Sequence, residues 1–271
     1  MSGAPRGVGD SLREWRQRRR LTQLELSNAT GISARHLSFI ETGRSQPSRA
    51  MISRLAEYLQ VPLRQRNELL TAAGYAAVYP MRALADPALA SARQTVELLL
   101  KAHEPYPAFA IDRHWMMVAS NEGFRPFIGD IDLSQFPRPF NVLRFTLHPR
   151  GLGPRIINHW QWRAHVYANL QRQIELSADS VLSALLEELR GYPLPAGVVP
   201  SDSAEVNPTE GFAVPFQLQT EYGALSFFST TTTFGTPLEI TLSEFSLECF
   251  YPVDAASAAI LHRASGKLPL R

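Results

Sequence analysis

Apolar residues in the first 74 positions recur at spacings of three or four, and most of these runs end at a glycine or before a proline. Such spacing places apolar side chains on one face of a helix. A serine or threonine hydroxyl satisfies free N–H groups in a first helical turn, and glycine tolerates the left-handed conformation at a helix end. The pattern predicts a bundle of five short helices, four capped by Ser11, Thr22, Ser33 and Ser48 and a fifth at residues 63–73.

Residues 75–91 break this pattern with two prolines, Pro80 and Pro87. Asp86 is suited to cap a helix, and Pro87 to occupy its first position, where no N–H is needed. The sequence therefore predicts a connector that contains a helix from Pro87 to about Lys101.

From Tyr106 onward, short runs of β-branched and aromatic residues replace the helical spacing. Residues 108–111 and 115–118 flank a turn and predict a β-hairpin, and Gly223 lies in a second turn that needs a positive φ. The other expected elements are a helical turn at residues 121–127, a segment at 141–147, helices at 157–175, 178–190 and 255–264, and strands at 216–220, 224–234 and 245–251. Strands at both ends with helices between them indicate one antiparallel sheet packed by helices.

We therefore expect a multi-domain chain with an all-α five-helix bundle at residues 1–79, a connector with a helix at 80–104, and an α+β domain at 105–271. The bundle contains twelve arginines, no lysine and six acidic residues, so it carries +6 in a chain of net charge +2, and the remainder carries −4. This charge layout is expected when only one part of a chain contacts phosphate.

Several protein classes are disfavoured by composition. No apolar run reaches the ~18 residues that a membrane span needs, and the N-terminus lacks the apolar stretch of a secretory signal. The single cysteine, Cys249, cannot form an internal disulfide, and no Cys/His cluster has the spacing of a zinc site. We expect a cytoplasmic protein with no metal and no obligatory cofactor.

Residues 22–44 predict a helix-turn-helix. A second helix that crosses a third at a steep angle needs a small residue at the contact, here Ser27, and a glycine in the turn, here Gly31. Inward-facing apolar residues are also needed, and Ile32, Leu37 and Ile40 have the required spacing. The opposite face of the third helix would enter the major groove of DNA with its N-terminal end first. It carries Ala34, Arg35, Ser38 and Thr42.

This stretch resembles the helix-turn-helix of the XRE family of bacterial regulators, also called Cro-repressor-like, over roughly residues 10–74. The matching motifs are Thr22-Gln23, Gly31-Ile32-Ser33, Ile40-Glu41-Thr42-Gly43-Arg44 and Pro47-Ser48. Ser27 departs from the alanine frequent in the family, which is sterically acceptable. The resemblance implies a sequence-specific DNA-binding transcription regulator whose partner is double-stranded DNA.

Three side chains are assigned separate roles on DNA. Gln23, at the start of the second helix, is expected to hydrogen-bond a phosphate. Arg35 is expected to read a base, because its fork can bind guanine O6 and N7 together, although a phosphate contact is the alternative. Arg44, just beyond the third helix, is expected to bind phosphate.

The remaining residues of the DNA-reading set have less defined roles. Ser33 caps the third helix and can also touch phosphate, and Ala34 lies on the reading face. For His36 and Ser38, contact with the DNA backbone is as consistent with the sequence as contact with bases. Phe39 either packs on a thymine methyl or covers the edge of the bundle.

The C-terminal part resembles the ligand-binding domain of MmyB-like transcription regulators, which joins a PAS-like fold to an XRE-type N-terminus. A hairpin followed by Asn121, which opens a helical turn, is how PAS-type sensor domains begin. Residues 140–145, the region of Trp160, residues 185–190 and the terminal strands also match. The resemblance implies a sensor of a small apolar ligand, with fatty acids as the suggested class.

Large apolar residues of this domain can line a pocket or simply form its core. The candidate pocket residues are Phe109, Ile111, Met117, Phe124, Phe145, Trp160, Leu182, Phe227 and Phe245. A carboxylate head group could meet Arg144, His148 or Asn158, and the sequence does not choose among these three.

We do not expect an enzyme. The chain has no Gly-x-Ser-x-Gly elbow, no phosphate-binding Gly-rich loop and no His-Glu-x-x-His motif. His159 and His165 are six positions apart, on different sides of a helix, so a shared metal is disfavoured. Because two-fold operators favour dimers, we expect a homodimer that forms through the helix at residues 87–101 or a sheet edge. The alternatives are a C-terminal domain that serves oligomerisation alone, or an enzyme tethered to DNA.

Overall fold

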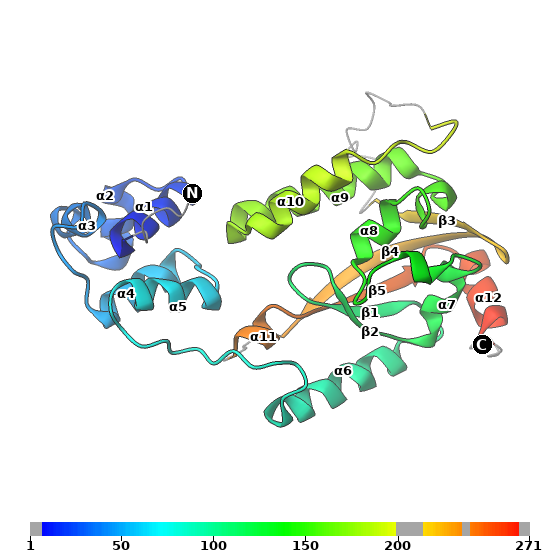
Figure 1. Ribbon diagram of the computed structural model, residues 1–271, viewed down its shortest axis with the longest axis horizontal. Coiled ribbons are helices and arrows are strands. Elements are labelled where there is room, and N and C mark those ends of the chain that lie inside the picture. The colour runs from blue at the N-terminus through cyan, green and yellow to red at the C-terminus, as the bar shows by residue number, and fades with distance from the viewer. Residues whose placement is uncertain (1–6, 199–213, 235–238, 266–271) are drawn as a thin grey trace. The chain divides into compact units, whose positions relative to one another are not determined.

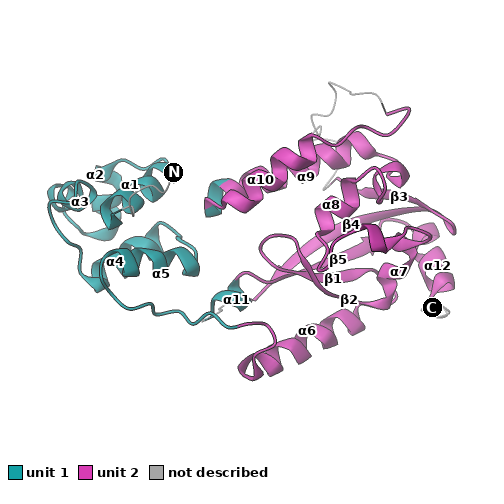
Figure 2. Ribbon diagram, viewed as in Figure 1, with its two compact units in different colours: residues 1–82, 175–177, 237–243 teal, residues 83–174, 178–236, 244–271 magenta. Residues whose placement is uncertain are grey.

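The computed structural model describes residues 7–198, 214–234 and 239–265 of the chain. It divides into two compact units (Figure 2). Unit 1 comprises residues 1–82, 175–177 and 237–243, and unit 2 comprises residues 83–174, 178–236 and 244–271. In the part of the chain that the structure describes, no helix is both long and apolar enough to cross a bilayer.

Unit 1 contains the five N-terminal helices that the sequence predicts (Figure 1). They are α1 Val8–Arg18, α2 Gln23–Thr30, α3 Ala34–Glu41, α4 Arg49–Tyr58 and α5 Leu63–Ala72. Thr22 and Glu25 form a reciprocal capping box, while Ser33 and Ser48 cap α3 and α4. The expected cap at Ser11 is wrong. Helix α1 begins one turn earlier, after Gly7, because Val8 also packs against the apolar core of the bundle.

Helices α1 and α3 touch at Gly9, a contact that the apolar pattern did not reveal. A Cβ atom at Gly9 would lie 2.1 Å from the carbonyl oxygen of Ile40, and backbone cannot yield as a side chain can. The hydrogen of glycine therefore allows the two helices to approach closely enough to bury Leu37 and Ile40.

Gly9→Ala is expected to lower the stability of unit 1 by about 1–3 kcal/mol, because the added methyl must push α1 away from α3. Gly7→Ala is the matched control. A Cβ there meets only Asp10 Oδ2, at 3.5 Å, so the loss should stay near or below about 1 kcal/mol. Hydrogen exchange of the α1 and α3 amides in the full chain measures the stability loss of each variant. Equal losses in the two variants would show that the close approach does not matter.

Unit 2 is built on one five-stranded antiparallel sheet with strand order β2-β1-β5-β4-β3. The strands are β1 Ala108–Ile111, β2 Met117–Ser120, β3 Phe216–Thr220, β4 Gly223–Thr233 and β5 Ser246–Pro252. Strand β2 starts two residues later than predicted. Asp112 Oδ1 accepts hydrogen bonds from the N–H groups of His114 and Met116, which lengthens the turn.

Helices cover both faces of this sheet (Figure 1). They are α6 Ala90–Ala102, α7 Arg125–Ile128, α8 Val142–Leu147, α9 His159–Ser177, α10 Ser180–Arg190 and α12 Ala255–Ala264; short α11, Ile240–Ser243, falls in unit 1. Single 3-10 turns occur at Pro87–Leu89, Glu122–Phe124, Leu133–Gln135 and Gly153–Arg155. As predicted, Asp86 caps the first of these turns, directly before α6.

Two apolar clusters result from the alternation of side chains along the strands. The larger cluster joins one sheet face, through Phe109 and Phe227, to helices α8, α9 and α10. The smaller cluster joins the other face to Val96 and Leu100 of α6. Helix α6 belongs to unit 2, and the expected antiparallel α+β fold is confirmed.

Candidate DNA-binding face and ligand-binding core

The outward face of α3 carries the side chains that the sequence proposes for DNA. Leu37 and Ile40 point into the core, which leaves Arg35 exposed and Ala34 and Ser38 half-buried. The Arg35 guanidinium lies 5.5 Å from the centroid of the Phe39 ring. A cation over an aromatic face is attracted to it. The ring of Phe39 therefore supports the arginine that the sequence assigns to base contact.

The ends of α3 are held by short polar contacts. Ser33 Oγ accepts a hydrogen bond from the N–H of His36 at 3.3 Å, which confirms its capping role. The His36 ring Nε2 lies 3.3 Å from Ser45 Oγ, so this side chain also fixes the loop after α3. Arg44 in that loop is exposed. Contacts of these residues with DNA remain predictions.

Gln23 has an internal partner that the sequence did not suggest. Its Nε2 donates a hydrogen bond to Glu41 Oε2 at 2.8 Å, which links the start of α2 to the end of α3. Glu41 is in turn bound by Arg16 of α1, through Nε at 2.6 Å and a terminal nitrogen at 2.7 Å. The expected phosphate contact of Gln23 is untested, and the structure assigns it a role in packing the reading helix.

The Arg16–Glu41 ion pair is buried at the junction of three helices. Burial alone would raise the pKa of Glu41, but hydrogen bonds from Arg16 and Gln23 and the Arg16 charge lower it below its ordinary value of 4.5. The hydrogen bond to Glu41 raises the pKa of Arg16. The sequence did contain a sign that Arg16 is buried, because Arg16 follows Leu12 by four positions and therefore lies on the same inward face of α1.

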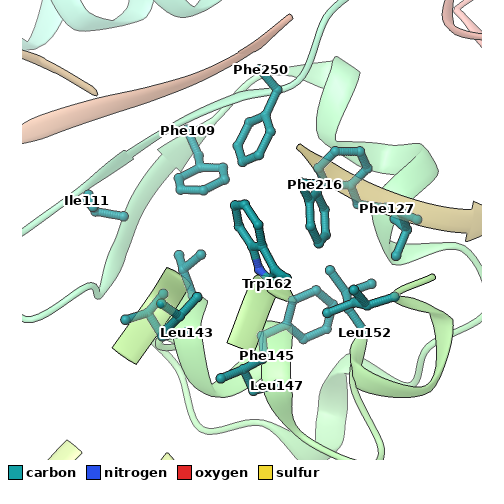
Figure 3. Close-up of a cluster of buried hydrophobic side chains, with 14 of the residues drawn as sticks. Phe109, Ile111, Phe127, Leu143, Phe145, Leu147, Leu152, Trp162, Phe216 and Phe250 are labelled. Carbon is teal, nitrogen blue, oxygen red and sulfur yellow. The ribbon is translucent and has the colours of Figure 1, made fainter. Parts of the chain in front are cut away.

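Most of the candidate pocket residues converge in the larger cluster of unit 2 (Figure 3). Those buried in it are Phe109, Ile111, Phe124, Phe145, Leu182 and Phe227, and Met117 packs against its edge. Sequence reasoning missed five buried aromatic members, which are Phe127, Phe136, Trp162, Phe216 and Phe250. Phe127 contacts the rings of Phe227 and Phe250 edge-on, with centroids 5.2 and 5.6 Å apart.

Two candidate pocket residues lie elsewhere. Trp160 is not part of the cluster; Trp162 is, because the buried positions of α9 follow the phase of Trp162, Val166 and Leu170. Phe245 is buried in the smaller cluster on the opposite sheet face, beside Leu247. The expectation that Trp160 and Phe245 belong to this core is therefore wrong.

The three candidate head-group residues already have bonds within the protein. Arg144 makes a two-pronged ion pair with Glu188, with nitrogen–oxygen distances of 2.7 and 2.8 Å. The Asn158 side chain donates to the Pro215 carbonyl at 2.7 Å and accepts from the N–H of Gln217 at 3.2 Å. These bonds tie α8 to α10 and the start of α9 to β3.

The third candidate, His148, is also held in place. Its Nδ1 accepts a hydrogen bond from the N–H of Arg150 at 3.0 Å, and its ring meets the Tyr192 ring edge-on. Burial lowers its pKa, and the Arg150 charge adds to this effect. A neutral imidazole is a weak partner for a carboxylate.

A hollow of about 660 Å³ lies apart from these candidates, where α12 meets the loop before β1. Its lining includes Glu104, Glu122, Arg125, Tyr222 and Leu261. The sequence did not point to it, because its walls come from four distant segments. Its walls mix charged and apolar side chains, whereas the larger cluster is apolar.

Comparison with known proteins matches both units. A sequence model for a helix-turn-helix matches residues 12–65, and one for the "MmyB-like transcription regulator ligand binding domain" matches residues 92–264. Over 73 residues the chain is 41% identical to the "Uncharacterized HTH-type transcriptional regulator RghRB" of Bacillus subtilis (strain 168). That alignment covers 27% of this chain and 50% of the relative, so the chain spans about half the length of the curated relative it matches.

Proposed function

Because this chain belongs to the family of MmyB-like transcription regulators, we propose that it reads a specific operator through α3 and that an apolar ligand, a fatty acid, alters this binding. The observation that carries the proposal is the exposed Arg35 on α3, in a module of net charge +6 joined to a ligand-binding domain. The charge attracts any duplex, and base contacts select among duplexes.

The reading face is rigid enough for base recognition. Ser33 caps α3 at its start, and Glu41 fixes its end through Arg16 and Gln23. A helix held at both ends presents Arg35 to a groove without paying much ordering entropy, since the Phe39 ring already supports the guanidinium. This supports Arg35 as a base-reading residue.

A set of hydrogen bonds provides a route from ligand to DNA. The N–H of Arg82 donates to Glu239 Oε1 at 2.8 Å, and the N–H of Ile240 donates to the Pro80 carbonyl at 2.9 Å. Thr241 Oγ1 donates to the Arg82 carbonyl at 2.6 Å. Residues 239–241 lie between β4 and β5 in the chain, and residues 80–82 belong to the segment that follows α5. A ligand that shifts these two strands would therefore also shift the segment that joins α5 to the C-terminal domain.

Two-fold operators favour a homodimer, and helix α6 supports this part of the proposal. Leu98 is 69% exposed and Leu99 is 43% exposed on its outer face. Apolar side chains of this size gain stability when a second copy covers them. The sheet edge that the sequence also suggested is formed by β2 or β3.

Palmitate tests the sensing role. The full-length protein, freed of bound lipid, is titrated with a DNA duplex that it has selected from a randomised library, with and without palmitate. Coupling between two sites is typically about fivefold or more in affinity, and we expect a change of that size. Unchanged affinity, with palmitate bound by native mass spectrometry, would reject modulation and leave an oligomerisation role for the domain.

A further inference from the structure

Among the described residues, three buried side-chain polar atoms have no hydrogen-bond partner; one is Nδ1 of His262 on α12, and the other two lie near the start of α9. These two are the indole Nε1 of Trp162 and Nδ1 of His159, and their residues are 7% and 2% exposed. Figure 3 shows the Trp162 ring at the centre of the aromatic cluster, with Phe109, Phe145 and Phe216 around it. A buried donor without an acceptor is costly and calls for an explanation such as a bound molecule.

Arg163, the next residue of α9, is a buried cation without a buried anion. It is 8% exposed, and no carboxylate among the described residues lies within ion-pair distance of its guanidinium. Its bonds go to neutral oxygens, namely Tyr167 Oη at 2.6 Å and the carbonyls of Arg190 at 3.0 Å and Leu189 at 3.4 Å. Buried charges are nearly always paired.

These three groups occupy one face of one helix end. His159, Trp162 and Arg163 follow the i, i+3, i+4 spacing that makes helix residues neighbours. Burial lowers the pKa of the His159 ring, and the nearby charge of Arg163 lowers it further. The imidazole is therefore neutral at physiological pH and does not act as a second cation.

The start of α9 adds a favourable field. Asn158 precedes the helix but makes no cap bond, because its side chain binds Pro215 and Gln217 instead. The first N–H groups of this 19-residue helix thus receive nothing from the capping side chain. The positive end of the helix dipole favours an anion there.

We propose that His159, Trp162 and Arg163 form the head-group site of the C-terminal domain and that it takes the carboxylate of an amphiphilic ligand. The indole N–H and the guanidinium donate to the carboxylate oxygens, and the apolar tail lies among the rings next to Phe216, whose centroid is 4.7 Å from that of Trp162. This inference rests on the proposed function. It replaces Arg144, whose charge is already paired with Glu188, and Asn158, whose amide is bound to the backbone of Pro215 and Gln217, whereas Arg163 binds only neutral oxygens.

The test compares palmitate with hexadecanol, which has the same tail and no charge, on the full-length protein freed of lipid. Wild type should bind palmitate at least about tenfold more tightly, because hydrogen bonds to charged groups contribute more than those to neutral ones. Trp162→Phe removes the N–H and keeps an aromatic ring, and should weaken palmitate about tenfold while hexadecanol changes little. Arg163→Gln should weaken palmitate at least as much.

Arg144→Gln is the matched control and should leave palmitate affinity within about twofold, as expected for a surface charge outside the site. The indole N–H resonance of Trp162, identified by its loss in Trp162→Phe, should shift when palmitate binds. The shift itself is measured on wild type, so it does not depend on how tightly any variant binds palmitate.

Each other outcome overturns the inference in a distinct way. If wild type binds both probes and Trp162→Phe and Arg163→Gln change neither, the head group lies elsewhere, while the domain still binds an apolar ligand as the proposed function requires. A loss with Arg144→Gln alone would return the head group to α8. If wild type binds neither probe, both the inference and the fatty-acid part of the proposed function are wrong.

Discussion

Replacing Glu41 by alanine is expected to lower the free energy of unfolding of unit 1 by about 3–5 kcal/mol, because it leaves the Arg16 guanidinium buried without its counter-ion. The variant also removes the acceptor of the Gln23 amide, so α1, α2 and α3 lose their common polar link. Hydrogen exchange of the α1–α3 amides in the full chain measures this loss separately from unit 2.

The matched control is Arg18→Ala, which breaks the exposed Arg18–Glu14 pair one turn along the same helix. Exposed pairs contribute about 0.2–1 kcal/mol, so this variant should remain close to wild type. The depressed pKa of Glu41 adds a pH signature. Its contribution is fully present above the ordinary pKa of 4.5 and is lost as pH falls through the lower folded pKa. Similar losses in both variants would contradict a buried pair.

Replacing Glu248 by glutamine is expected to stabilise unit 2 at about pH 8 by about 3 kcal/mol. Burial of this strand residue, which is 6% exposed, raises its pKa to about 7, although the hydrogen bond from Thr231 Oγ1 at 2.6 Å acts in the opposite direction. The folded protein therefore holds a proton that the unfolded chain releases near 4.5. Stability falls as pH rises between these two values, and glutamine removes that fall.

Urea unfolding followed by tryptophan fluorescence checks this, since Trp115, Trp160 and Trp162 all lie in unit 2. At about pH 4 the variant and wild type should be nearly equal, because Glu248 is then mostly protonated in both the folded and the unfolded state. Glu221→Gln, in an exposed turn, is the control and should show no such pH-dependent gain. A gain of equal size at both pH values would show that charge is not the cause.

Local signals accounted for most of the secondary structure. The Thr22 cap, the left-handed Gly31 and the turn at Gly223 were readable because each depends on residues within one turn of the chain. The need for glycine at position 9 could not be predicted in this way, because it arises from a close approach to the backbone of Ile40, 31 positions later in the chain. A glycine near a chain end gives no local sign of such a contact.

The candidate sites divide in the same way. Helical periodicity was sufficient to separate buried Leu37 from exposed Arg35 on α3. It failed on α9, where aromatic residues on more than one face left the phase open and Trp160 was chosen over Trp162. The ion pair between Arg144 and Glu188 could not be predicted either, because 44 positions separate the two residues in the sequence.

The central claim is that Arg35 on α3 reads bases in the groove of an operator. The most direct measurement is the affinity of full-length wild type and Arg35→Ala for a library-selected duplex and for an unrelated duplex, across a series of salt concentrations. We expect a loss of about 1–3 kcal/mol on the selected duplex and little on the unrelated one, with salt-sensitive binding throughout. Equal losses on both duplexes, or no salt-sensitive binding by wild type, would contradict the claim.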